Sequence, residues 1–79
     1  MYSKHMKALA DVKDGKWDKA HRLVQSMADR DSCLIHGYLH RLEGDCGNAR
    51  YWYGRANQTM PENSLEEEWN RLCDLISSD

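Results

Sequence analysis

HGYLHRLEGDCGNARYWYGRA, residues 36–56, is the stretch of sequence that decides the fold. Apolar side chains recur in it at intervals of three and four residues, on both sides of the pair Glu43 and Gly44. This spacing is typical of two amphipathic helices. Because glycine accepts the left-handed conformation that commonly ends a helix, the stretch predicts a helical hairpin that turns at Gly44.

The same helical spacing continues outward in both directions. Residues typical of β-sheets are scarce, since the chain has two Ile, two Val and one Thr. Asp31 or Ser32 is expected to cap the third helix, and Ser64 with Glu67 forms a capping box at the last helix. The sequence predicts helices over 3–14, 16–29, 32–43, 46–58 and 64–77.

These helices predict one all-α domain over residues 1–79, in which two helical hairpins, 3–29 and 32–58, stack and a C-terminal helix, 64–77, caps them. The two hairpins resemble each other in sequence. DGKWDKAHRLVQSM (14–27) aligns without gaps with EGDCGNARYWYGRA (43–56), at an offset of 29 residues. The offset lies within the range of roughly 20–50 residues found in repeat proteins.

The aligned segments resemble the tetratricopeptide repeat. In that resemblance Gly44 makes the turn between the helices, Ala49 allows close helix approach, Tyr53 is the aromatic residue and Ala56 the small closing residue. The period is shorter than the usual length of about 34 residues, and no proline closes the first repeat. The resemblance implies tetratricopeptide-like hairpins with a groove for a peptide or a partner helix.

A closer resemblance covers most of the chain. Residues 36–56, preceded by WDKAHRLVQ, look like a group of small bacterial and fungal proteins with the pattern HxxLHRxEGD followed by NAxYWYxRA. This resemblance implies a family and a fold, and it carries no activity over to this chain.

Composition excludes several classes of protein. Hydrophobic residues make up 41% and charged residues 30% of the chain, as in a globular domain. The formal net charge of −2 argues against a nucleic-acid-binding protein, which needs a basic face. No apolar run approaches the roughly 20 residues that span a membrane, and the N-terminal segment lacks a signal-peptide core. We expect a cytoplasmic protein whose three cysteines are free thiols.

The most distinctive candidate site is a stripe formed by His36, His40 and Glu43, at positions i, i+4 and i+7 of one predicted helix. His21 of the preceding helix is expected to join them in the groove between the hairpins. The sequence leaves three interpretations open: hydrogen bonds at a helix interface, a pocket for a polar ligand, and a metal ion held by His36, His40 and Glu43.

Other polar residues crowd the turn between the third and fourth helices. Asp45 is placed to cap the fourth helix, with Asn48 turned toward the neighbouring hairpin. Arg41 or Arg55 could hold a carboxylate ligand. Tyr51 is expected to point outward, as part of a surface for a partner protein.

These observations predict a small interaction or ligand-binding module that is not an enzyme and needs no cofactor. No nucleophile motif or glycine-rich phosphate loop is present in the sequence. Its partner would be a protein or a small polar ligand, and because two repeats leave the ends of the stack open, self-association is favoured. The alternative is a small metal protein or enzyme that uses the His and Glu stripe.

Overall fold

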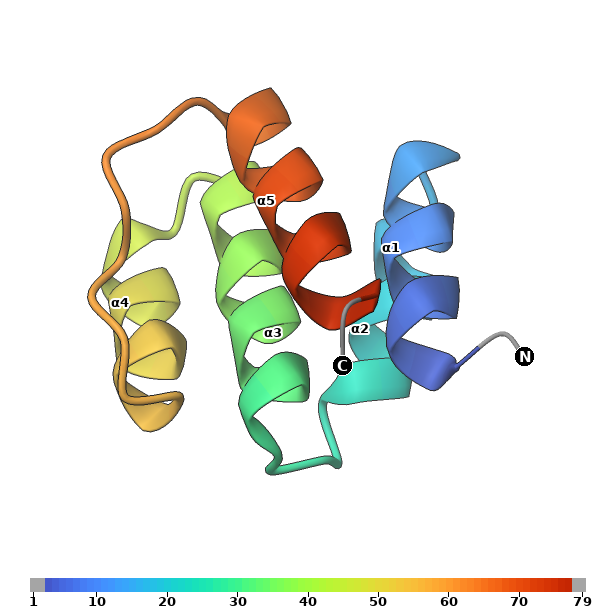
Figure 1. Ribbon diagram of the computed structural model, residues 1–79, viewed down its shortest axis with the longest axis horizontal. Helices are drawn as coiled ribbons and strands as arrows, with labels where there is room; N and C mark the ends of the chain where they lie inside the picture. Colours follow the sequence, from blue (N-terminus) through green and yellow to red (C-terminus); the bar gives the residue numbers. More distant parts are fainter. Residues whose placement is uncertain (1–2, 78–79) are drawn as a thin grey trace.

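The computed structural model describes residues 3–77 and folds them into five helices (Figure 1). No strand occurs among these residues, so the predicted all-α class is confirmed. None of these helices is both long and apolar enough to cross a membrane. The helices are α1 (Lys4–Lys13), α2 (Trp17–Val24), α3 (Arg30–Leu42), α4 (Cys46–Arg55) and α5 (Leu65–Ser77).

The first four helices form two hairpins whose turns have the same geometry. Gly15 and Gly44 both have positive φ, +75° and +83°, as the sequence predicts. After Gly15 the Lys16 amide donates to the Asp11 carbonyl at 2.8 Å, and the amide after Gly44 makes the equivalent bond to the His40 carbonyl at 2.9 Å. Each turn is thus a Schellman motif, which satisfies carbonyls at the end of the helix.

The helix starts partly confirm the expected caps. Asp29 caps α3, since its side chain accepts a hydrogen bond from the Ser32 amide, so the expectation that Asp31 or Ser32 caps this helix is wrong. The carboxylate of Asp29 precedes the first helical residue and therefore reaches the free amides of the first turn. The capping box is confirmed: the Ser64 amide donates to Glu67 at 2.9 Å, and the Glu67 amide donates to Ser64 Oγ at 3.0 Å.

Helix α5 packs against α1 and α3, the first helices of the two hairpins (Figure 1). The Trp69 indole nitrogen donates to the carbonyl of Leu9 at 3.0 Å. The Tyr38 hydroxyl donates to the carbonyl of Leu65 at 3.1 Å. Because both acceptors are backbone atoms, these bonds fix the position of α5 along both hairpins.

A buried carboxylate joins α5 to α4. Glu68 is fully buried and accepts hydrogen bonds from the Tyr53 hydroxyl at 2.7 Å and from Asn63 at 2.9 Å. Arg71 adds a bidentate pair at 2.7 and 2.9 Å. Although burial opposes ionisation, the hydrogen bonds from Arg71, Asn63 and Tyr53 lower the pKa of Glu68.

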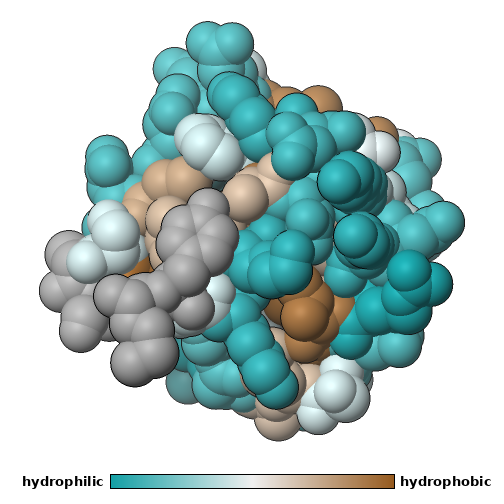
Figure 2. Space-filling view, turned by 90° about the vertical axis from the view of Figure 1, so that its right-hand side faces the viewer, coloured by the Kyte–Doolittle hydropathy of each residue, from teal (hydrophilic) through white to brown (hydrophobic). Residues whose placement is uncertain are grey.

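The core lies where α3 meets its neighbours, and it contains most of the predicted apolar stripes. Leu42 is an exception, since it is 36% exposed at the C-terminal end of α3. The face formed by α1 and α2 is mostly hydrophilic, with small apolar areas (Figure 2). The largest fully buried apolar side chains are Tyr53, Leu9, Leu34, Ile35, Leu39 and Leu72.

Candidate functional site

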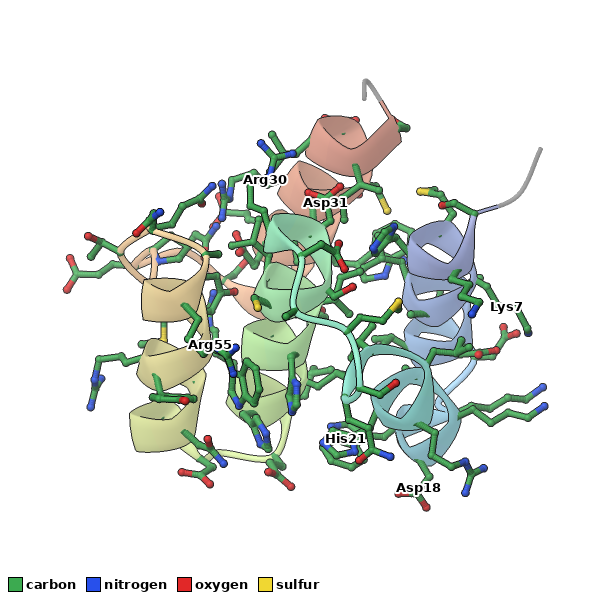
Figure 3. All side chains as sticks on the ribbon, turned by 90° about the horizontal axis from the view of Figure 1, so that it is seen from below. Lys7, Asp18, His21, Arg30, Asp31 and Arg55 are labelled. Carbon is green, nitrogen blue, oxygen red and sulfur yellow. The ribbon has the colours of Figure 1, made fainter. Side chains whose placement is uncertain are left out.

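Three histidines from two helices converge beside the core. His36 and His40 are one turn apart on α3, and both are buried. His21 comes from α2, where the Trp17 indole nitrogen donates to the Leu39 carbonyl of α3 at 2.8 Å. Because His21 follows Trp17 by one helical turn, this anchor directs the His21 ring toward α3. Figure 3 shows the His21 side chain on the side of α2 that faces α3.

The histidine cluster, defined as His21, His36 and His40, is compact. Nε2 of His21 lies 3.1 Å from Nε2 of His36. One candidate ligand atom from each of the three rings lies within 4.8 Å of the other two. Nδ1 of His36 is buried and has no hydrogen-bond partner among the described residues. The arrangement therefore leaves one buried ring nitrogen of this cluster, Nδ1 of His36, without the partner that a purely structural role would supply.

Two tryptophans flank the cluster. The Trp17 ring stacks on His21 with the centroids 4.7 Å apart and the planes at 10°. The Trp52 ring stacks on His36 with a centroid distance of 3.8 Å and an interplanar angle of 12°. Because aromatic neighbours restrict ring rotation, they hold the imidazoles close to one orientation.

Glu43 binds the outer nitrogen of one cluster member. Its Oε1 lies 2.6 Å from Nδ1 of His40, which leaves Nε2 of His40 for the cluster. This pairing, a carboxylate on the far nitrogen of a histidine, is the usual support of a metal-binding imidazole. The carboxylate of Asp45 lies close to His40 and Glu43, and its Oδ1 caps α4 by accepting from the Asn48 amide at 3.3 Å, as the sequence predicts.

Burial keeps the inner imidazoles uncharged. Together with the neighbouring charges of His21, His40 and Arg55, which act in the same direction, it lowers the pKa of His36 to about 4. Burial also lowers the pKa of His21, with His40 adding to the effect, while Glu43 and Asp18 oppose it. Near neutral pH both rings are therefore neutral, the state in which an imidazole nitrogen binds a metal ion.

The other candidate residues lie around the cluster or away from it. The Arg41 guanidinium donates to the side-chain oxygen of Asn63 at 2.9 Å and to the backbone carbonyl of Asn63 at 2.6 Å. These two bonds hold the segment that precedes α5. Asn48 is exposed. The sequence suggested that its side chain faces the neighbouring hairpin, but among the described residues no hydrogen bond joins the Asn48 side chain to that hairpin.

The remaining candidates form an exposed group on α4. Tyr51 is 57% exposed, as expected for an outward-facing side chain. The guanidinium of Arg55 lies 4.9 Å from the Trp52 ring centroid and 6.0 Å from that of Tyr51. Figure 3 shows Arg55 on the α4 side of the molecule, away from His21. Arg55 therefore packs on Trp52, the residue that stacks on His36.

Sequence reasoning missed two residues of this site, Trp17 and Asp45, as neighbours of the imidazoles. The signal for Trp17 is its place four residues before His21 on one helix face. Asp45 was assigned only to the cap of α4. Both roles depend on how α2 and the turn at Gly44 approach α3, which spacing within one helix does not specify.

Two hollows in the described surface lie away from the histidines. One, of about 250 Å³, lies between α1 and α2 and is lined by Lys7, Asp11, Lys19, Arg22 and Leu23. The other, of about 230 Å³, lies between α1 and α5 and is lined by Met6, Leu9, Ala10, Lys13, Asp14, Trp69 and Cys73. Neither includes a member of the histidine cluster.

Comparison with known proteins gives no match: no family model matches this chain, and neither a curated protein nor a solved structure matches it.

Proposed function

We propose that the protein binds a divalent transition-metal ion through His21, His36 and His40. The observation that carries this proposal is the convergence of three imidazoles, with candidate ligand atoms within 4.8 Å of one another. At metal–nitrogen distances of about 2.0–2.1 Å, two ligands of a tetrahedral ion are roughly 3.3–3.4 Å apart. The two Nε2 atoms that lie 3.1 Å apart are therefore already close to that separation.

The donor type narrows the choice of metal. Imidazole nitrogens suit Zn²⁺, Cu²⁺ and Ni²⁺, whereas Mg²⁺ and Ca²⁺ prefer oxygen donors. No cysteine belongs to the histidine cluster, so nothing in it favours Cu⁺. In this proposal His21 is the third metal ligand, the role that the sequence analysis gave to Glu43. Glu43 instead binds the outer nitrogen, Nδ1, of His40.

Metal binding would connect two parts of the fold. His21 belongs to α2, and the other two ligands belong to α3. An ion shared between these helices stabilises the folded state by mass action, because the unfolded chain does not hold the three rings together.

The test is metal binding by EDTA-treated protein. We expect Zn²⁺ to bind one ion per chain in isothermal titration calorimetry and to raise the melting temperature. His21→Ala should lose most of this affinity while keeping the helical circular dichroism signal. His5→Ala is the matched control, since His5 lies on α1 beside Asp29, outside the cluster. Equal zinc affinity in the His21 and His5 variants would contradict the proposal.

A second candidate function is binding of a partner protein by the exposed face of α4. The observation that favours it is Tyr51, which is 57% exposed and next to the Arg55 guanidinium. Aromatic residues and Arg are enriched at protein interfaces. In this second proposal the protein is a small non-catalytic interaction module of the cytoplasm, a location consistent with its three free cysteines. Loss of a copurifying partner in Tyr51→Ala, with zinc affinity unchanged, would support it.

A further inference from the structure

Resting on the metal site proposed above, we infer that the bound ion keeps one coordination position for water and hydrolyses small uncharged esters there.

The donor set is three imidazoles. Among the described residues, the candidate metal group that contains His21 and His36 has His40 as its third member and no fourth. The carboxylate of Glu43 is hydrogen-bonded to the outer nitrogen of His40 at 2.6 Å. Structural zinc sites are closed by four protein ligands, whereas sites with three protein ligands hold water in the fourth position. The cluster therefore matches the open type.

The positive charge of the metal centre would lower the pKa of a water molecule bound to it. Three neutral imidazoles leave the full charge of +2 on the ion, because no thiolate or carboxylate is among these donors. Under three histidine ligands, zinc lowers the pKa of its bound water to about 7. A large fraction of the bound water is then hydroxide near neutral pH, which is a strong nucleophile.

Solvent reaches the cluster at His21, its one member among the described residues that is not buried. His36 and His40 are buried, but His21, Trp17 and Trp52 are only half-buried. The indole rings of Trp17 and Trp52 provide apolar surface beside the imidazoles for the acyl or aryl part of a substrate.

Charge at the rim selects against anions. Glu43 and Asp45 are both exposed and lie next to His40. Since like charges repel, the two carboxylates disfavour phosphate esters and carboxylated substrates. A small uncharged ester fits both the apolar walls and the acidic rim.

The reaction balances without a further reagent. The metal-bound hydroxide attacks the ester carbonyl carbon, a new C–O bond forms, and the bond to the alcohol oxygen breaks. The proton of the former hydroxide passes, by way of solvent, to the departing alkoxide, which leaves as the alcohol, and the acid leaves as a carboxylate. A new water then binds the ion and releases its proton to solvent, which restores the starting state.

The experiment compares zinc-loaded protein with EDTA-treated protein in the hydrolysis of 4-nitrophenyl acetate. We expect the zinc-loaded protein to be faster by roughly tenfold or more, since metal-bound hydroxide is a potent nucleophile. His21→Ala and His40→Asn should reduce the rate to the metal-free level, and His5→Ala should keep it. The anionic probe 4-nitrophenyl phosphate should be a poor substrate under the same conditions.

Two outcomes would overturn the inference, and they differ from failure of the metal site. If calorimetry shows one zinc per chain but the hydrolysis rate equals that of the metal-free protein, the open position is refuted and the metal site stands. If the phosphate probe is cleaved faster than the acetate, the assignment to uncharged esters is refuted. If no zinc binds at all, both the inference and the proposed function fail.

Discussion

Replacing Gly37 by alanine tests how closely α3 and α4 approach. A Cβ atom built on Gly37 would lie 2.8 and 2.9 Å from two carbons of the Tyr53 ring and 3.1 Å from the Ala49 carbonyl oxygen. The ring cannot easily move, because Tyr53 is fully buried and its hydroxyl donates to Glu68 at 2.7 Å. The carbonyl oxygen belongs to the backbone of α4, so only a shift of the helix would relieve that contact.

Two opposing terms set the size of the effect. Alanine is favoured over glycine inside a helix by about 1 kcal/mol, and overpacking of a core costs about 1–3 kcal/mol. With three contacts this short the overpacking cost dominates, so we expect Gly37→Ala to lower the free energy of unfolding by about 1–2 kcal/mol. Gly54→Ala is the matched control, since a Cβ there meets nothing within 4 Å. It should stabilise the fold by about 0.5–1 kcal/mol.

The assay is urea unfolding of both variants and the parent, followed by circular dichroism. The free energies of unfolding of the two variants should differ by about 1.5–3 kcal/mol, with opposite signs relative to the parent. If Gly37→Ala is as stable as Gly54→Ala, the two helices do not approach as closely as described here, and the stacking of Trp52 on His36 loses its structural basis.

Further predictions concern the site and its support. Glu43→Gln should weaken zinc binding by about 10–100-fold in calorimetry, the usual effect of losing an outer carboxylate, and unchanged affinity would remove its supporting role. The free energy of unfolding of the metal-free protein should fall by up to about 3 kcal/mol as the pH falls from roughly 6.5 to 4, because the unfolded chain protonates His36 in this range while the folded protein, in which the pKa of His36 is about 4, does not. Urea unfolding at pH 7 and pH 4 measures this change, and His36→Gln should flatten the pH dependence. Gly44→Val should cost about 1–3 kcal/mol through strain at its positive φ, and an unchanged melting temperature would contradict it. Cu²⁺ should quench the fluorescence of Trp52 far more than that of Trp69, which single Trp→Phe variants would resolve.

Much of the fold follows from local patterns in the sequence. The five helices were predicted because apolar spacing and breakers such as Gly15 and Gly44 act within a few residues of the chain. Helix ends were less predictable, since Asp29 and not Asp31 or Ser32 caps α3. Asp29, Asp31 and Ser32 all have side chains that can accept a hydrogen bond from a first-turn amide, and the backbone conformation decides among them.

The site was predictable only in part. His36 and His40 share a face because of helical periodicity alone, whereas the place of His21 depends on the packing of α2 against α3. The contact between Glu43 and His40 could not be predicted from residue spacing either. Its position suggested a ligand beside the two histidines, but the helix ends at Leu42 and the carboxylate reaches the outer nitrogen of His40 instead.

The bond from the Trp69 indole to the Leu9 carbonyl joins residues 60 positions apart in the chain. Synthesis proceeds from the N-terminus, so α1 leaves the ribosome well before α5. Until α5 emerges, the faces of α1 and α3 that it covers remain exposed to water, and neither hairpin can complete its core. Leu65–Ser77 can cover both hairpins only after it has emerged, so the nascent chain carries uncovered apolar surface on α1 and α3 until then.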